Sequence, residues 1–181
     1  MDGADPTIDE LITWLDRDDA ESRPHRAQRL RLLMTEYGPT ERYLFFVGDI
    51  SLQVFEEARL AYLNGLFIAC VLLCQVCLEH MLAGLFRIAG RDDLERAGFA
   101  TFLEAARNEG YISTEEFALF DHLREIRNPY THSRPPGAPG SLRQRAILSN
   151  THPAGLTVQD AEAAIRALLD LFRRAPFTVE E

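Results

Sequence analysis

The sequence contains no lysine, and all 19 of its basic residues are arginines. Any phosphate or carboxylate partner is therefore contacted by planar guanidinium groups, which bind such anions through two parallel hydrogen bonds. Acidic residues outnumber arginines by 28 to 19, which gives a formal net charge of −9. This charge argues against a protein that coats DNA with its whole surface, although it is compatible with a local basic patch.

Cysteine is also scarce, and the three cysteines, Cys70, Cys74 and Cys77, lie close together. An odd number of cysteines provides no disulfide framework and favours a reducing compartment. Their C-x-x-x-C-x-x-C spacing is that of the cluster ligands in radical SAM enzymes, but the same spacing places them on one face of a helix. Because the surrounding segment is apolar, we expect three buried core thiols and no metal or other cofactor.

Long apolar runs are absent as well. The most apolar stretch, Gly65 to Leu78, has 14 residues, whereas a membrane-spanning helix needs about 20. The N-terminal segment MDGADPTIDE is acidic and has no apolar signal core. We therefore expect a cytoplasmic protein without membrane contact, in which this stretch forms a buried core helix.

The chain shows neither the alternating apolar pattern of strands nor an Asn-Gly hairpin turn. Helical periodicity predicts helices over residues 7–16, 24–36, 52–89 and 99–108, the longest with a kink near Asn64-Gly65. We expect a single all-α domain of residues 1–181. It consists of an up-and-down helical bundle over residues 50–174, preceded by a helical extension over residues 1–48.

The clearest helix start is Ser113-Thr-Glu-Glu116, a capping box whose two ends satisfy each other's backbone N–H groups. This helix is expected to end at Asn128, because Pro129 cannot continue it without losing a backbone hydrogen bond. Residues 133–155 are rich in proline and glycine and predict a long surface loop. The run Thr157-Val-Gln-Asp160 is similar to a second capping box and predicts a last helix that ends near Arg174.

The end of the capped helix contains the run Arg127-Asn-Pro-Tyr-Thr-His132. We expect Pro129 to break the helix, so that His132 folds back beside Arg127. A permanent cation next to an imidazole, which ordinarily titrates at about pH 6.5, suits phosphodiester chemistry. The histidine can move a proton, and the arginine can bind a phosphate and stabilise the charge that grows in the transition state.

The segment LREIRNPYTH resembles the R-x4-6-H motif of the HEPN superfamily, and EARLAYLNGLFIACVLLCQVCLEHMLAGLF resembles the long second helix of its bacterial branches. The resemblance covers roughly residues 50–174. It implies a helical bundle that forms a homodimer with the motif helices facing each other. It also implies a metal-independent endoribonuclease in a toxin or defence setting, which uses the ribose 2′-hydroxyl as an internal nucleophile.

The resemblance implies a role for each matching residue. His132 acts as general base or acid, and Arg127 holds the scissile phosphate. Asn128 matches a polar residue that often follows the motif arginine, and Glu79 matches an acidic position of the long helix, where it pairs with Arg127. Two further residues of the motif helix are expected to support the site: Tyr130 and Arg124.

One position departs from a subtype of the family. HEPN toxins that are paired with nucleotidyltransferase antitoxins often carry a tyrosine two residues after the histidine, and this chain has Arg134 there. An antitoxin or another protein is nevertheless an expected partner, beside RNA and a second copy of the chain.

The motif lies in a locally basic region. From His122 to Pro153 the chain has five arginines and one acidic residue, a local net charge of +4. Such a region can follow a nucleic-acid backbone, and it can equally be plain solvated surface. The candidate RNA-binding residues outside the motif are Arg134, Arg143 and Arg145.

Two other functions stay open at this point. A non-catalytic module that binds RNA, a nucleotide or a protein needs the basic region but not His132. A purely structural dimerisation domain needs only the long apolar helix as its interface. The motif arginine also has a structural interpretation, because a cation in the last turn of a helix interacts favourably with the free carbonyl groups there.

Overall fold

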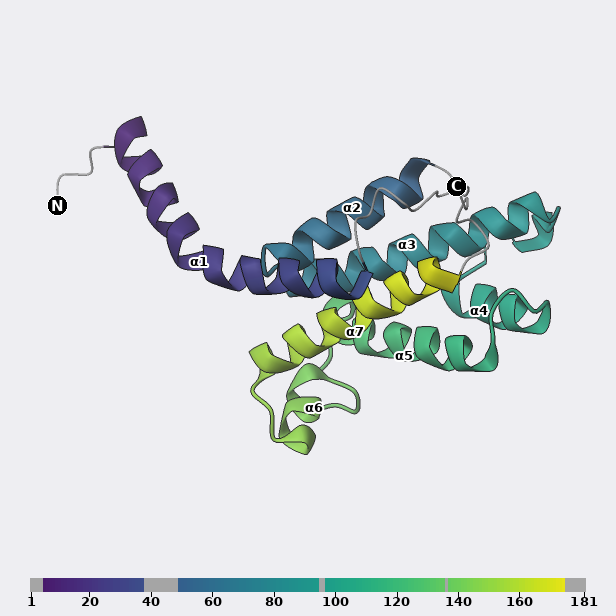
Figure 1. Ribbon diagram of the computed structural model, residues 1–181. Helices are drawn as coiled ribbons and strands as arrows, with labels where there is room; N and C mark the ends of the chain where they lie inside the picture. The colour runs from purple at the N-terminus through teal and green to yellow at the C-terminus, as the bar shows by residue number, and fades with distance from the viewer. Residues whose placement is uncertain (1–4, 38–48, 95–96, 136, 175–181) are drawn as a thin grey trace. The chain divides into compact units, whose positions relative to one another are not determined.

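A computed structural model describes residues 5–37, 49–94, 97–135 and 137–174 (Figure 1). The chain forms two compact units, Met1–Pro39 and Thr40–Glu181. All regular structure in the described residues is helical, which confirms the expected all-α class. The elements are α1 (Ile8–Tyr37), α2 (Asp49–Leu63), α3 (Phe67–Ile88), η2 (a 3-10 turn, Asp92–Leu94), α4 (Phe99–Asn108), α5 (Thr114–Thr131), α6 (Leu142–Ser149) and α7 (Pro153–Arg174).

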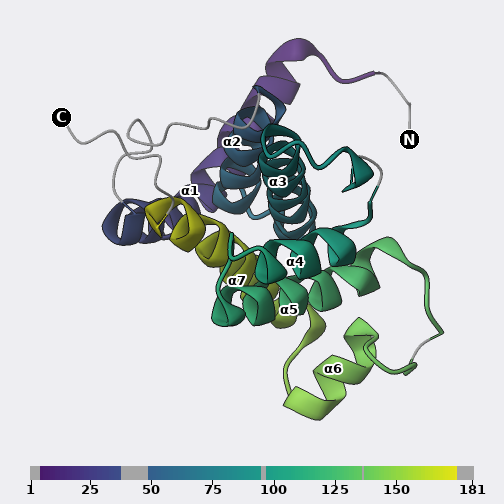
Figure 2. The ribbon, with the colours of Figure 1, turned by 90° about the vertical axis from the view of Figure 1, so that its right-hand side faces the viewer.

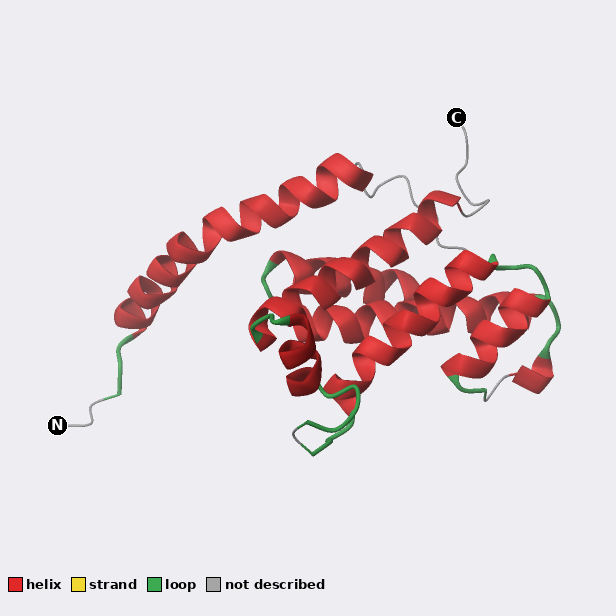
Figure 3. Ribbon diagram, turned by 90° about the horizontal axis from the view of Figure 1, so that it is seen from below, coloured by secondary structure: helices red, strands yellow, loops and turns green. Residues whose placement is uncertain are grey.

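In the first unit, α1 is one helix of 30 residues, so the prediction of two separate helices over 7–16 and 24–36 is wrong. Its start is capped, because the Thr7 hydroxyl accepts from the Glu10 backbone N–H while the Glu10 carboxylate accepts from the Thr7 N–H at 2.8 Å. Pro24 lies inside the helix and removes one backbone hydrogen bond. Figure 3 shows that α1 bends but does not break. Residues 38–48 of the expected extension lie outside the described residues.

In the second unit, the predicted long apolar helix is divided into α2 and α3 by a tight turn. The Leu66 N–H donates to the Ala61 carbonyl at 2.8 Å and the Gly65 N–H donates to the Tyr62 carbonyl at 3.1 Å, the pattern of a Schellman motif. This turn needs a residue with positive φ, and Gly65 has φ of 78°. The predicted kink is therefore a full reversal that folds α2 back along α3.

The core of this unit is built around α3, which contacts α2, α4, α5 and α7 (Figure 2). By length and composition α3 could cross a membrane, and half of its most apolar window is buried inside the unit. Cys70, Cys74 and Cys77 are completely buried, as expected from their spacing. The Cys77 thiol donates to the Ser51 carbonyl at 3.4 Å, and burial raises the pKa of Cys77 to about 12. These thiols are core groups in contact with neighbouring helices.

Two short-range predictions are confirmed at the other side of the core. The helix over 99–108 is α4, with the expected bounds. The capping box that starts α5 is also present: the Ser113 hydroxyl accepts from the Glu116 N–H at 3.1 Å, and the Glu116 carboxylate accepts from the Ser113 N–H at 2.8 Å. The capping box fixes the start of the helix that leads to the motif.

We expect Ser113→Ala to lower the free energy of unfolding by about 1 kcal/mol, the typical value of a lost N-cap. For a unit of this size the melting temperature falls by roughly 2–4 °C. Thr114→Ala, one residue further on, is the matched control and should leave the melting temperature almost unchanged. Equal melting temperatures for the wild type and Ser113→Ala would show that the cap contributes nothing.

Residues 133–155 do not form one long loop, as the composition predicts, because they contain α6. The Ser141 hydroxyl caps this helix by accepting from the Gln144 N–H at 3.2 Å, and Asn150 ends it in the left-handed conformation. The last helix, α7, begins at Pro153, four residues before the predicted start at Thr157. Proline suits a first helical position, since the missing N–H has no partner there in any case.

Candidate functional site

A cavity of about 470 Å³ opens where α5 ends and α6 begins. Three of its lining side chains carry or can acquire positive charge, namely His132, Arg134 and Arg143. Among the lining residues that the structure describes, none is acidic. The others are Pro129, Tyr130, Thr131, Ser133, Ser141 and Leu142. The cavity therefore offers a positively charged, hydroxyl-bearing surface that suits an anionic ligand.

The shape of the cavity depends on how α5 ends. The predicted break at Pro129 is wrong, because α5 continues to Thr131 with Pro129 inside its last turn. Pro129 costs α5 only one backbone hydrogen bond. The last turn is still closed, because the His132 N–H donates to the Asn128 carbonyl at 3.0 Å. His132 is the C-cap residue, with φ −121° and ψ 121°. The extended backbone at this residue turns the chain away from the helix axis and into the cavity wall.

Arg127 does not line this cavity. Its guanidinium donates to the Thr131 hydroxyl at 3.2 Å and lies 3.5 Å from the Asn128 side-chain oxygen. No hydrogen bond between Arg127 and His132 is observed, and the predicted placement of His132 beside Arg127 stays a prediction.

The ion pair predicted between Arg127 and Glu79 is also not observed in the described residues. No ion pair joins Glu79 to Arg127, and within the described residues Arg127 has no carboxylate partner. An unneutralised guanidinium at the end of the motif helix keeps its positive charge available to a ligand.

Two of the arginines predicted to contact RNA, Arg134 and Arg143, differ from Arg124, which is predicted to support the site, in how far their charge is neutralised. Arg143 is exposed and forms no hydrogen bond with any described residue, so its guanidinium is available to a ligand. Arg134 is exposed and donates to the Pro139 carbonyl at 2.8 Å, which fixes its stem at the cavity rim. Arg124 is partly neutralised, since its guanidinium donates to the Asp121 carboxylate at 2.7 Å. Arg134 and Arg143 thus remain suitable for RNA contact.

Arg145, predicted to bind RNA, instead forms an ion pair with a buried carboxylate. Its two terminal nitrogens donate to the two oxygens of Asp160 at 2.5 and 2.8 Å, and the Asp160 side chain is only 5% exposed. The Tyr130 hydroxyl donates to the same carboxylate at 2.6 Å. The prediction that Asp160 belongs to a capping box is therefore wrong: it binds two residues from other helices.

This cluster of the buried Asp160 with the half-buried Tyr130 and Arg145 connects α5, α6 and α7. The hydrogen bonds that the Arg145 guanidinium donates to the Asp160 carboxylate hold the pKa of Arg145 above its usual range. Burial, together with the carboxylate, also raises the pKa of Tyr130. Both groups therefore stay protonated, and both keep donating to Asp160. Because Tyr130 lines the cavity and α6 carries Arg143, the cluster joins two elements of the cavity wall.

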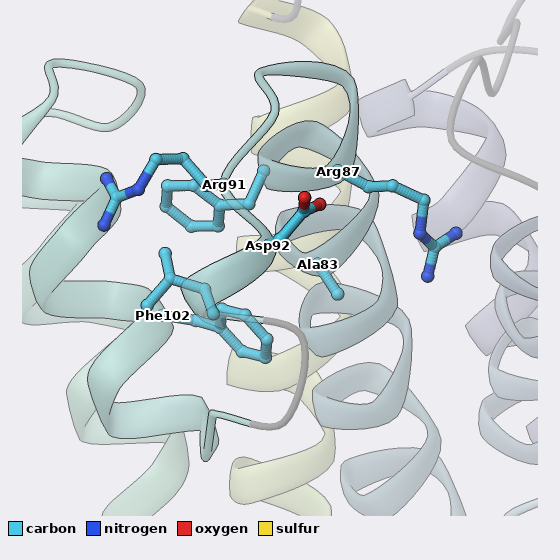
Figure 4. A pocket seen from close by; sticks show the side chains of 7 residues that line it. Ala83, Arg87, Arg91, Asp92 and Phe102 are labelled. Carbon is cyan, nitrogen blue, oxygen red and sulfur yellow. The ribbon is translucent and has the colours of Figure 1, made fainter.

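A second cavity, of about 220 Å³, lies between the end of α3, η2 and α4 (Figure 4). The stacked rings of Phe86 and Phe102 form part of its wall. Figure 4 shows the guanidinium groups of Arg87 and Arg91 pointing away from each other. Arg91 is neutralised by ion pairs with Asp93 and Glu109. This cavity therefore has no converging cations and is a weaker candidate for an anion site.

Sequence reasoning finds His132, Arg134 and Arg143 but misses the residues that complete the cavity. Ser133 and Ser141 come from the segment interpreted as a loop, and Leu142 is the first residue of α6. A usable signal exists in Ser141-Leu-Arg-Gln144, a capping-box pattern that the surrounding prolines and glycines obscure. Comparisons with protein-family models, with curated proteins and with solved structures find no match to this chain.

Proposed function

We propose that this chain is a metal-independent endoribonuclease of HEPN type, which acts in a toxin or defence setting as a homodimer with a composite Arg/His site. The observation that supports the proposal is the cavity at the end of α5, where His132, Arg134 and Arg143 meet with no acidic residue among the described lining. Cleavage of RNA by its own 2′-hydroxyl needs a group that moves protons beside cations that hold the phosphate. The cavity provides both in one place.

The proposed reaction balances without an added reagent. The 2′-oxygen attacks phosphorus, its proton passes to His132, and the bond to the 5′-oxygen breaks. The partner subunit's His132 gives a proton to the departing 5′-oxygen. Arg143 binds the phosphate oxygens, whose negative charge increases in the transition state. Arg127, which lies outside the cavity in a single copy, reaches the phosphate only as part of the composite site of the homodimer. The products are a 2′,3′-cyclic phosphate and a free 5′-hydroxyl.

The experiment that tests this function is incubation of a mixed-sequence RNA with the purified full chain in EDTA. We expect fragments with 2′,3′-cyclic phosphate ends. RNA that stays intact at every protein concentration would contradict the proposal.

A second function is favoured by one observation, the position of Arg127 outside the cavity that contains His132. In a single copy of the chain, Arg127 and His132 do not line the same cavity. This arrangement suits a module that binds RNA without cleaving it. The two functions differ in cleavage and not in binding. Under the first, the wild-type chain cleaves RNA and His132→Ala lowers the rate by about 10² to 10⁴-fold. Under the second, neither protein cleaves RNA and both bind it equally.

Both functions predict that Arg143 contacts the phosphate backbone. We expect Arg143→Ala to reduce the slope of log K against log salt by about 0.7, the value for one phosphate contact on single-stranded nucleic acid. Filter binding of a single-stranded RNA over a salt series measures this slope. Arg124→Ala removes the same charge from a residue already paired with Asp121 and serves as the matched control. Equal slope changes for the two variants would assign the effect to net charge alone.

A further inference from the structure

The two arginines that line the cavity at the end of α5 differ in how firmly the chain holds them. Arg134 donates from Nη1 to the Pro139 carbonyl at 2.8 Å, so its side chain closes the loop that leads to α6. Arg143 is exposed and has no hydrogen-bond partner in the described part of the chain. A ligand that binds Arg143 must therefore order a free side chain, whereas Arg134 is ordered before the ligand binds.

The end of this loop is itself fixed to the first turn of α6. The Gly140 N–H donates to the Gln144 side-chain oxygen at 2.7 Å. The Ser141 N–H donates to the Ala138 carbonyl at 2.9 Å, and Ser141 is buried. These hydrogen bonds hold the backbone on both sides of the carbonyl group that Arg134 contacts.

Gly140 leaves room for the guanidinium. A Cβ atom at this position would lie 3.3 Å from Arg134 Nη1, which is closer than an ordinary van der Waals contact. Gly140 also has φ of 74°, in the left-handed region that favours glycine. Gly137 of the same loop has a similar φ, 85°, but a Cβ atom there would meet no described residue within 4 Å. The close approach to Arg134 therefore distinguishes Gly140 from Gly137.

The hydrogen bond to Pro139 leaves one edge of the Arg134 guanidinium for a ligand, the edge formed by Nε and Nη2. No described residue accepts a hydrogen bond from these two atoms. Their N–H groups are parallel and match two oxygens of a phosphate. Arg91 shows the same edge in use, because its Nε and Nη2 donate to the two oxygens of Asp93 at 2.8 and 2.7 Å. Arg134 thus offers two fixed donors in a cavity whose described lining has no acidic residue.

We propose that Arg134 is the anchor that fixes the position of one phosphate of the bound RNA strand, through two parallel hydrogen bonds from Nε and Nη2, and that Gly140 is its positioning residue. The inference rests on the proposed function for the identity of the ligand, but it does not require cleavage. Arg143 contributes its charge from a free side chain, whereas Arg134 contributes a fixed direction. The two arginines should therefore respond differently to lysine, which keeps the charge but lacks the planar pair of donors.

Binding of the full chain to a single-stranded 2′-O-methyl oligoribonucleotide tests the anchor, because this strand has no free 2′-hydroxyl and is not cleaved by the proposed reaction. We expect Arg134→Lys to lower the affinity about tenfold, the effect of losing one hydrogen bond to a charged group. The slope of log K against log salt should stay unchanged, because the number of positive charges is the same. Arg143→Lys is the matched control and should keep the affinity within about twofold of the wild type.

Three results of this experiment would overturn the inference: equal affinity of Arg134→Lys and the wild type, an equal loss in both lysine variants, and a wild-type chain that does not bind the strand. None of them decides the ribonuclease proposal, which depends on the cleavage of RNA measured separately. Absence of cleavage together with the expected binding differences would contradict the ribonuclease proposal alone.

A second test asks whether Gly140 acts through Arg134. We expect Gly140→Ala to lower the affinity about threefold in the wild-type chain and to have no further effect in the Arg134→Ala variant. Gly137→Ala introduces a similar backbone strain without the contact and should leave the affinity unchanged. An equal loss in both glycine variants, a loss from Gly140→Ala that persists without Arg134, or no loss at all would each show that Gly140 does not position the arginine.

Discussion

His132→Ala should lower the rate of RNA cleavage by about 10² to 10⁴-fold, the usual contribution of a positioned general acid or base. The side chain is exposed, and no hydrogen bond from it to a described residue is observed, so its removal costs little stability. The loss should therefore appear in the rate of the chemical step while the melting temperature and RNA affinity stay close to the wild-type values. Single-turnover cleavage in EDTA separates this step from binding and product release.

His122→Ala is the matched control for this prediction. His122 is an exposed histidine of α5 that lies nearly three turns before His132 and outside the cavity. Its removal should leave the cleavage rate within about twofold of the wild type, far less than the effect of a general acid or base. An equal loss of cleavage rate in both variants would show that His132 has no specific role in the reaction. Equal cleavage by the wild type and both variants would point to another nuclease in the preparation.

Asp160→Ala should give the largest loss of stability, about 1.5–3 kcal/mol, the cost of removing hydrogen bonds to a charged group while the part-buried Arg145 stays accessible to water. Asp160 is nearly inaccessible, and its carboxylate is the acceptor for both Arg145 and Tyr130. Without it, α6 loses its polar connection to α5 and α7. RNA binding through Arg143 should weaken as well, because the cavity wall is no longer held in place.

Chemical denaturation measures the stability change. Asp170→Ala removes the same charge from the same helix, α7, at a residue with no ion-pair partner in the described part of the chain, and should change stability by less than about 0.5 kcal/mol. Asp160→Asn retains an acceptor oxygen for Tyr130 and should fall between wild type and Asp160→Ala. A change below about 1 kcal/mol for Asp160→Ala would show that the cluster adds little to stability.

The features that could be predicted from the sequence are those decided by neighbouring residues. The Ser113–Glu116 capping box and the bounds of α4 depend on contacts within one turn, so a local pattern is sufficient. The burial of the three cysteines follows from their spacing along a single apolar helix face.

The features that could not be predicted depend on partners far along the chain or on the cost of a single proline. Asp160 has the local pattern of a cap, but Arg145, fifteen residues away, binds its carboxylate instead. Pro24 and Pro129 both lie inside helices, because one lost hydrogen bond is a smaller penalty than ending the helix there.

The measurement that tests the central claim most directly compares two versions of one oligonucleotide in EDTA. The first is all RNA, and the second has 2′-deoxyribose at every position that the chain cleaves in the first. The proposed ribonuclease cuts the first into fragments with 2′,3′-cyclic phosphate ends and leaves the second intact, because the second lacks the internal nucleophile. Cleavage of both, or of neither, would contradict the account.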